Sequence, residues 1–206
     1  MTAFSPNPTR RSLHGVAELL LAGPQHRATG EIALRVTEDG FATAFTPDLR
    51  FDGTAVVLGE LRVDVAGLSY ADVAAAVGVS AGEPAGLYKD GSGVRPDEHI
   101  VVDSVVARAI LDAFGVGDEA LRRFAPEAER ILWPEHFDVG ITIGAVNYGI
   151  APGDEHVPEP YAYVGPHTPQ QGEFWNVPFG AAQPVHDLGD TAAVVDFFAT
   201  GRRLAG

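Results

Sequence analysis

The sequence contains no cysteine. Disulfides, thiol nucleophiles and thiolate metal sites are therefore excluded, and a bound metal would need histidine and oxygen ligands. No run of roughly eighteen apolar residues occurs, and the first residues lack the apolar core of a signal peptide. We therefore expect a protein without a membrane partner, located in the cytoplasm.

Basic residues are also scarce, with 14 lysines and arginines against 28 acidic residues and a formal net charge of -14 at pH 7. Such a charge repels phosphate backbones unless basic groups cluster. The arginine doublets at positions 10, 122 and 202 lie far apart in the sequence. We therefore expect no nucleic-acid partner.

The common catalytic motifs are absent as well. The chain has no G-x-S-x-G elbow, no H-E-x-x-H helix and no G-x-x-x-x-G-K-[ST] loop. Gly91-Ser92-Gly93 lies in a segment rich in turn residues and lacks the strand-to-helix context of a phosphate cradle, so we interpret it as a turn. The sequence leads us to assign no metal and no cofactor.

The first half of the chain predicts a helix followed by strands. At 206 residues and 46% hydrophobic content, the chain can form one domain, with residues 1–10 as a loose arm. Apolar spacing indicates a helix over about 11–22 that ends at Gly23-Pro24. Alternating apolar residues between turns over 30–65 then predict an antiparallel meander.

The second half returns to helices and then to strands. Ser69 can cap a short helix over 70–77 that ends at Gly78. Further helices are expected from Asp103 to Gly115, over 118–131 and from about 191 to 203, and the remaining strands are expected over 139–143, 146–150, 161–164 and 174–177. This order predicts an α+β fold in which a curved antiparallel sheet or sandwich is covered by helices.

Residues 133–182 hold both tryptophans and three of the seven histidines. Two tyrosines two residues apart on a strand point to one face and could form the wall of a pocket. We therefore predict a small-molecule-binding pocket lined by Trp133, His136, Tyr161, Tyr163, Trp175 and Asn176. The alternative is that these rings only fill the core, or that the segment is the interface of a homo-oligomer or an adaptor.

Histidines stand beside carboxylates at three places, 97–99, 135–138 and 154–156. A carboxylate next to a histidine can raise its basicity, and both can bind a divalent ion. The second hypothesis is therefore an enzyme, with or without a divalent ion, whose candidate catalytic residues are His136, Asp138, Glu155 and His156. The alternative for each histidine is a hydrogen bond to a loop carbonyl.

Several segments carry a family resemblance. They are LWPEHFDVGITIGAVNYGIAPGDEHVPEPYAYVGP, FWNVPFGAA, LHGVAELLLAGPQHRATGEIALRV and GLYKDGSGV. From about Leu13 to Ala182 the chain resembles an actinobacterial family of uncharacterised proteins, and the part from Phe137 onward distantly resembles another family of unknown function. Neither resemblance implies an activity or a catalytic residue.

Overall fold

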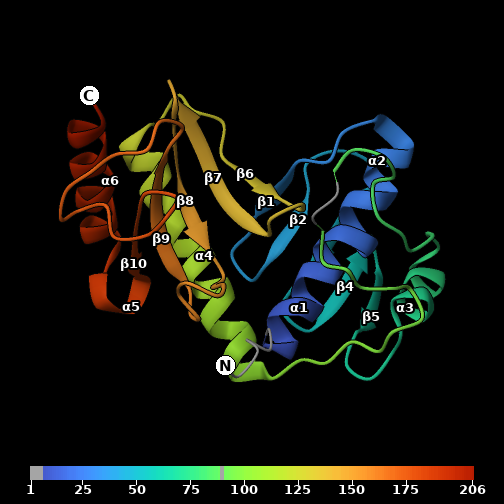
Figure 1. Ribbon diagram of the computed structural model, residues 1–206. Coiled ribbons are helices and arrows are strands. Elements are labelled where there is room, and N and C mark those ends of the chain that lie inside the picture. The colour runs from blue at the N-terminus through green and yellow to red at the C-terminus, as the bar shows by residue number, and fades with distance from the viewer. Residues whose placement is uncertain (1–6, 89–90) are drawn as a thin grey trace. The chain divides into compact units, whose positions relative to one another are not determined.

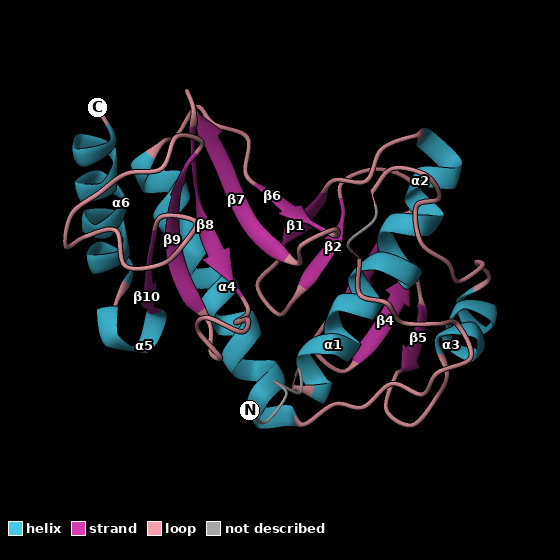
Figure 2. Cartoon of the chain, viewed as in Figure 1, coloured by secondary structure: helices cyan, strands magenta, loops and turns pink. Residues whose placement is uncertain are grey.

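The computed structural model describes residues 7–88 and 91–206. The chain forms two compact units: unit 1 is Met1–Leu111 with Leu132–Phe137, and unit 2 is Asp112–Ile131 with Asp138–Gly206. Each unit combines helices with antiparallel strands (Figure 1, Figure 2). The predicted α+β class with a curved antiparallel sheet is confirmed, whereas a single domain stays a prediction.

The first helix begins earlier than the sequence pattern indicates. The side chain of Asn7 accepts hydrogen bonds from the backbone amides of Thr9 and Arg10, and so caps helix α1 (Pro8–Gly15). The expected loose arm is therefore wrong from Asn7 onward, and residues 1–6 lie outside the described part. A cap at Asn7 followed by proline at the first helical position is a local start signal that apolar spacing misses.

The same helix also continues past its predicted end. A π-helical segment, η1 (Val16–Ala22), leads directly into α2 (Gly23–Thr29). Pro24 does not end the helix: it lies directly after the π-helical segment, and Ala22 and Gly23 before it keep helical backbone angles. A Cβ atom at Gly23 would lie 1.7 Å from the carbonyl oxygen of Gly82, so this glycine permits close contact between two backbones.

Six strands of unit 1 follow the order β6-β1-β2-β3-β4-β5. Neighbours from β1 to β5 pair antiparallel along the chain, so the predicted meander is confirmed. β6 joins β1 through the pair Leu34 and Leu132. The strands are β1 (Leu34–Val36), β2 (Phe41–Thr43), β3 (Leu49–Phe51), β4 (Ala55–Leu58), β5 (Leu61–Asp64) and β6 (Ile131–Trp133).

Helix η1 lies in the core of unit 1. It contacts β1, β2 and β3, and all seven of its residues are buried. Helix α3 (Tyr70–Val77) packs beside it and against β4 and β5. Its predicted ends are confirmed, because Ser69 and Asp72 form a capping box and Gly78 adopts a left-handed conformation.

Unit 2 is a four-stranded antiparallel sheet with the order β7-β8-β9-β10. Phe124 and Phe198, from two helices, contact the Tyr148 ring on one face of this sheet. The elements are β7 (Asp138–Ile143), β8 (Val146–Ala151), β9 (Tyr161–Pro166), β10 (Ala181–Pro184), α5 (Val185–Leu188) and α6 (Thr191–Ala205). The expected strand over 174–177 is wrong; only Val177 bridges Gly180 there, before β10.

Helix α4 (Ser104–Phe124) runs without a break, although two helices separated at Gly115 were expected. A glycine inside a helix lowers its stability only modestly, and packing can outweigh that loss. The predicted helical segment over 118–131 is wrong after Phe124, because the chain turns and continues as β6. None of the helices within residues 7–88 and 91–206 combines the length and the apolar character needed to cross a bilayer.

Candidate functional site

The most unusual side chain of unit 1 is a carboxylate inside an apolar helix. Glu18 is 1% exposed and lies in η1, where its six neighbours are all apolar and buried. A π-helical turn within a longer helix occurs frequently at functional sites. A buried carboxylate is costly unless partners compensate the loss of water, so the surroundings of Glu18 decide its role.

A loop far along the chain contacts one side of this carboxylate. Oε2 of Glu18 accepts a hydrogen bond from the backbone amide of Ser92 at 3.0 Å and another from the Ser92 hydroxyl. A Cβ atom at Gly91 would lie 2.0 Å from Oε1, so any other residue there would have to displace the carboxylate of Glu18. Gly91 and Gly93 are exposed, so this loop is a thin cover over the carboxylate.

The other carboxylate oxygen has no hydrogen bond. Glu18 Oε1 and the hydroxyl of Tyr88 are both buried, and neither has a hydrogen-bond partner in the described part of the chain. Burial raises the pKa of Tyr88, and the nearby Glu18 carboxylate raises it further. A hydrogen bond to Glu18 also contributes to the raised pKa of Tyr88, so the two groups are neighbours that share a loose contact without the geometry of a well-formed bond.

His14 lies one helical turn before Glu18. Its Nε2 is 2.7 Å from the carbonyl oxygen of Pro134, which can only accept, so Nε2 carries the hydrogen. Burial lowers the pKa of His14, opposed by the negative charge of Glu18. The imidazole is therefore neutral at pH 7, and its Nδ1 is left as a hydrogen-bond acceptor.

The turn that His14 contacts contains a strained residue. Phe137 has φ of 52°, a left-handed conformation that bulky residues rarely adopt, and its side chain is fully buried. Its ring stacks on His14 with 5.5 Å between ring centroids and packs edge-on against Phe41. This packing holds the turn that carries Glu135, whose charge also raises the pKa of Tyr88.

We call His14, Glu18, Tyr88 and Ser92 the Glu18 site. All four residues belong to unit 1: His14 and Glu18 come from the first helix, and Tyr88 and Ser92 are described residues on either side of 89–90. Local sequence patterns did not reveal them. The available signal was Glu18 itself, the only charged residue between Val16 and Ala22, in a helix otherwise suited to the core.

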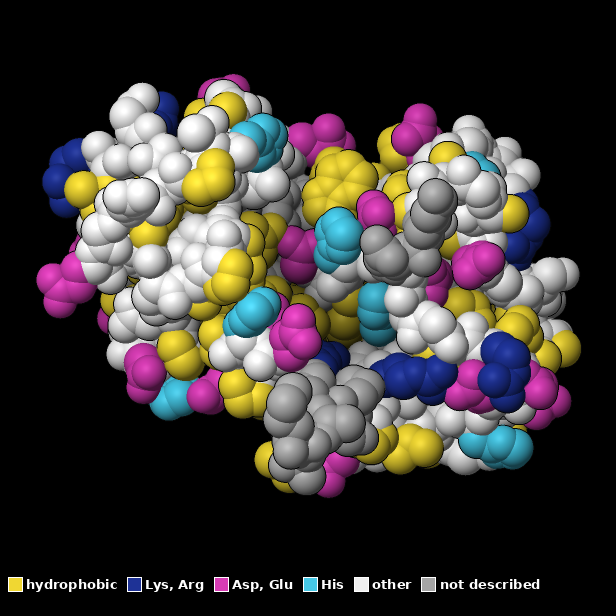
Figure 3. Space-filling view, viewed as in Figure 1, with side chains coloured by type: hydrophobic (Ala, Val, Ile, Leu, Met, Phe, Trp, Pro, Cys, Tyr) yellow, Lys and Arg dark blue, Asp and Glu magenta, His cyan; other side chains and the backbone are white. Residues whose placement is uncertain are grey.

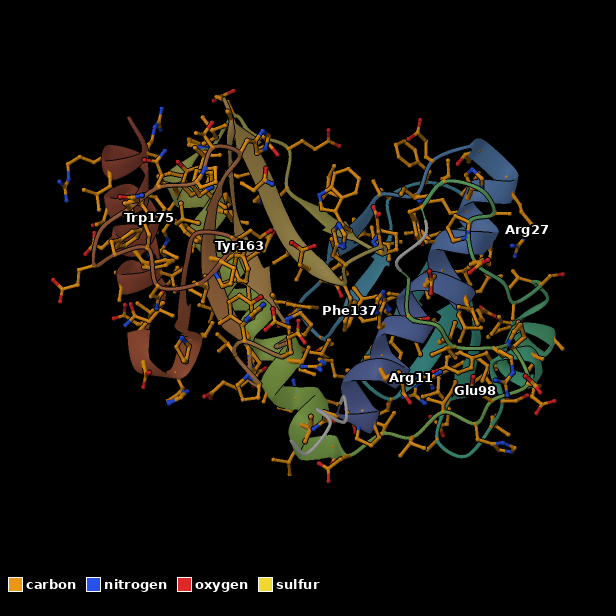
Figure 4. The ribbon with its side chains drawn as sticks, viewed as in Figure 1. Arg11, Arg27, Glu98, Phe137, Tyr163 and Trp175 are labelled. Atoms are coloured by element: carbon orange, nitrogen blue, oxygen red, sulfur yellow. The ribbon has the colours of Figure 1, made fainter. Side chains whose placement is uncertain are left out.

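The predicted aromatic pocket is distributed over both units. Trp133 and His136 belong to unit 1, and Tyr161, Tyr163, Trp175 and Asn176 belong to unit 2. Tyr161 and Tyr163 share one face of β9, as expected, with 6.5 Å between ring centroids. Trp175 lies beside α6, apart from Tyr163 in Figure 4.

Tyr163 lies over a pair of glycines. Gly140 on β7 pairs with Gly149 on β8, which pairs with Tyr163 on β9. A Cβ atom at either glycine would lie within 2.8 Å of the tyrosine hydroxyl oxygen. The hydroxyl donates a short hydrogen bond to Oδ2 of Asp138, and burial together with the Asp138 charge raises the pKa of Tyr163 well above its ordinary value.

Other predicted site residues of unit 2 form hydrogen bonds that hold loops. The Asn176 amide donates to the carbonyl of Ala182 and accepts from its amide, both at 2.9 Å. Asp154 accepts from the hydroxyl of Tyr161 at 2.5 Å and from the backbone amide of His156 at 2.7 Å. These polar atoms therefore have partners within the protein, and the indole of Trp175 packs on Phe174.

The histidine and carboxylate clusters are spread along the surface. His136 is 3.9 Å from Glu135, and His156 is 3.8 Å from Glu155, both longer than a hydrogen bond. Asp138 bonds to Tyr163, and in the cluster at 97–99 the carboxylate of Glu98 binds Arg11. Among the described residues, no group of three or more histidines and carboxylates could hold a metal ion.

Carboxylates are dispersed over the visible face of each unit, and arginine side chains are fewer (Figure 3). This distribution agrees with the net charge of the chain and shows no broad basic patch on that face. Comparison of the chain with protein-family models, with curated proteins and with solved structures found no match.

Proposed function

We propose that the protein binds a small molecule at the Glu18 site of unit 1. The observation that carries this proposal is the pair of buried polar atoms, Glu18 Oε1 and Tyr88 Oη: neither has a well-formed hydrogen bond within the described residues, and the two groups interact only loosely with each other. A ligand that bonds to both atoms would remove an energetic cost of about 1–3 kcal/mol for each. The family resemblance carries no activity, so the proposal depends on these residues alone.

A purely structural role explains only half of the arrangement. The bonds from Ser92 to Oε2 hold the loop over the helix, and an amide oxygen could accept them equally well. They give no reason for a second, charged oxygen in a buried position. Functional sites often retain such unfavourable groups, and their replacement then stabilises the unliganded protein.

The substitution Glu18→Gln tests the proposal, because it keeps an acceptor for Ser92 and removes the charge. We expect the melting temperature of the unliganded variant to be unchanged or higher than that of the natural protein. In a thermal-shift screen of polar metabolites, a ligand at about 100 times its Kd should stabilise the natural protein by about 2.7 kcal/mol, or roughly 5–10 °C. Glu18→Gln should lose this shift.

Glu60→Gln is the matched control, because Glu60 is an exposed carboxylate of the same unit. It should keep the ligand-induced shift. A marked loss of stability in unliganded Glu18→Gln would support the structural role instead. Stabilisation that survives in Glu18→Gln would move the binding site elsewhere in the protein.

A second candidate is an enzyme that uses the same site for acid and base chemistry. The observation that favours it is the separation of protonation states: His14 has a lowered pKa and is neutral at pH 7, whereas Tyr88 has a raised pKa and keeps its proton. Any compound found in the screen can be followed by NMR for conversion. A product that forms with the natural chain and not with His14→Gln would support this candidate.

The proposed ligand would be met in the cytoplasm, the location that the sequence predicts. A homo-oligomer also stays a prediction of the sequence, which light scattering would test. The proposal for the Glu18 site depends neither on this location nor on the oligomeric state.

A further inference from the structure

We infer that strand β5 of unit 1 pairs with β5 of a second copy of this chain, so that two sheets join edge to edge in a homodimer. This surface is distinct from the Glu18 site and from the segment 133–182, where the sequence predicts an interface. β5 is the outermost strand of the unit 1 sheet (Figure 1), and within residues 7–88 and 91–206 it pairs with β4 alone. A strand with one neighbour presents a row of backbone groups to a second one.

The hydrogen-bond pattern between β4 and β5 shows which backbone groups point outward. The amide of Val65 donates to the carbonyl of Thr54 at 3.0 Å. Bonded and non-bonded residue pairs alternate along an antiparallel ladder, so Val63 also bonds to β4. Arg62 and Asp64 occupy the alternate positions, and their amide and carbonyl groups therefore point away from β4. A further strand can bond to these four backbone groups.

The outer strand of unit 2, β10, is closed to such pairing. The amide of Val185 donates to the carbonyl of Pro160, so by the same alternation the outward residues of β10 are Ala182 and Pro184. The Asn176 side chain bonds to both backbone groups of Ala182, and Pro184 has no amide hydrogen. β5 contains no proline, and no described side chain caps its outward backbone groups.

The charges of β5 favour a second copy of the same strand as the occupant. Charged edge residues usually discourage pairing, but Arg62 and Asp64 carry opposite charges on one face of the strand. A twofold axis at Val63 places Arg62 opposite Asp64 of the second copy, and the symmetry repeats this pair. An axis at Arg62 or at Asp64 would place like charges opposite each other. An axis at Leu61 would use Glu60, which lies in the turn before the strand.

The exposure of the β5 side chains agrees with this register. The side chains of Asp64 and Arg62 are 75% and 48% exposed, although both also form ion pairs within one chain. With the axis at Val63, this residue meets its own copy, and Leu61 lies opposite Val65 of the second copy. Leu61 is 53% exposed, so pairing would remove an apolar side chain from water.

Analytical ultracentrifugation of the full chain tests this dimer through exchanged charges. Interfaces smaller than about 1,200 Å² are typical of transient contacts, so we expect a monomer–dimer equilibrium with a dissociation constant on the order of 100 µM. Arg62→Asp and Asp64→Arg should each weaken self-association at least about tenfold, because each variant alone places like charges opposite each other. An equimolar mixture of the two variants should dimerise again, because the aspartates of one chain then face the arginines of the other.

Glu60→Arg is the matched control, because it makes the same change of charge as Asp64→Arg but lies in the turn outside the strand. It should leave the dimer unchanged. Hydrogen exchange of the natural protein gives a second measurement that needs no variant to fold. The amides of Arg62 and Asp64 should exchange more slowly as the protein concentration rises, because pairing gives them acceptors.

Three results would overturn the inference. The first is a monomer at all concentrations up to about 1 mM, tenfold above the expected dissociation constant. The second is a dimer whose formation is the same in both charge variants as in the natural protein, which would place the interface elsewhere. The third is exchange at Arg62 and Asp64 that does not depend on protein concentration.

Discussion

Arg11 connects the first helix to the segment that precedes α4, through the carboxylate of Glu98 and the carbonyl of Gly93. Its Nη1 lies 2.7 Å from Glu98, and its Nη2 donates to the carbonyl of Gly93 at 2.8 Å. Figure 4 shows Arg11 and Glu98 together at one side of unit 1. The same arginine therefore supports the loop whose Gly91 and Ser92 cover Glu18.

The contact between Arg11 and Glu98 predicts how the stability of the fold depends on pH. Hydrogen bonds from Arg11 and then from the Arg95 amide lower the pKa of Glu98 from 4.5 to about 2. Because the folded pKa is below the unfolded value, the contribution to stability is complete above about pH 4.5 and is lost as the pH falls toward 2. Arg11→Met should raise the pKa of Glu98 by at least about one unit, measured by NMR of the side-chain carboxyl.

Arg95→Met is the control for this experiment. The Arg95 side chain is 71% exposed and its backbone amide remains after the substitution, so the pKa of Glu98 should change much less. An unchanged pKa of about 2 in Arg11→Met would show that Arg11 is not the cause. The NMR signal of the Ser92 backbone amide should also move in Arg11→Met, because the loop loses its bond at Gly93.

At the scale of elements, helix α4 contains two glycines with opposite surroundings. A Cβ atom at Gly117 would lie 2.2 Å from the Cγ1 atom of Ile150, so the helix can approach β8 only without a side chain there. At Gly115 a Cβ atom would meet nothing within 4 Å. Both positions lie in the same helix but differ in packing. A substitution at Gly115 therefore reports helix propensity, and a substitution at Gly117 reports the contact with the sheet.

We therefore expect opposite effects of alanine at these positions. Gly115→Ala should raise the free energy of unfolding by about 0.5–1 kcal/mol through helix propensity. Gly117→Ala should lower it by about 1–3 kcal/mol, because overpacking displaces Ile150. Chemical denaturation measures both values.

The double variant Gly117→Ala with Ile150→Ala checks the cause of that loss. Its stability should exceed the value obtained by adding the two single losses, because the removed side chain leaves room for the new methyl group. Additive losses would show that Gly117 matters for a reason other than its contact with β8.

At the scale of the whole molecule, α4 belongs to both units. Its residues up to Leu111 lie in unit 1, and those from Asp112 onward lie in unit 2. Separation of the units on unfolding would need a break inside this helix, and helical order is cooperative along the chain. The number of unfolding transitions therefore tests the single domain that the length of the chain predicts.

We expect one calorimetric transition, with equal calorimetric and van't Hoff enthalpies, as small cooperative domains show. The boundary between Leu111 and Asp112 lies inside a helix that continues on both sides, which favours this result. Two resolved transitions would contradict the single-domain prediction and define the units as separate domains. The substitution Gly117→Ala, which lies in unit 2, would then shift only one of them.

Much of the fold could be predicted from short patterns. The meander over β1 to β5 follows from alternating apolar residues and turns, and the ends of α3 follow from Ser69, Asp72 and Gly78. These signals act between residues that are near one another in the chain. The same local rules failed at Gly23-Pro24 and at Gly115, where the helix continues past residues that usually favour its end.

The candidate site was less accessible to such reasoning. Tyr161 and Tyr163 share a face as predicted, because a strand alternates its side chains. Closeness in the sequence does not show that the predicted pocket residues meet in space. The structure assigns Trp133 and Asn176 to different units. Glu18 was visible only as a charge that did not fit its helix.

The sequence by itself determined the acidic charge, the absence of thiol chemistry, the α+β class and most strands, because composition and short-range periodicity are properties of the chain at any conformation. Only the tertiary structure decided that Ser92 meets Glu18 across 74 positions and that, among the described residues, the other carboxylate oxygen has no well-formed hydrogen bond. The physical reason is that burial and hydrogen-bond satisfaction depend on contacts between distant segments, which no local pattern contains.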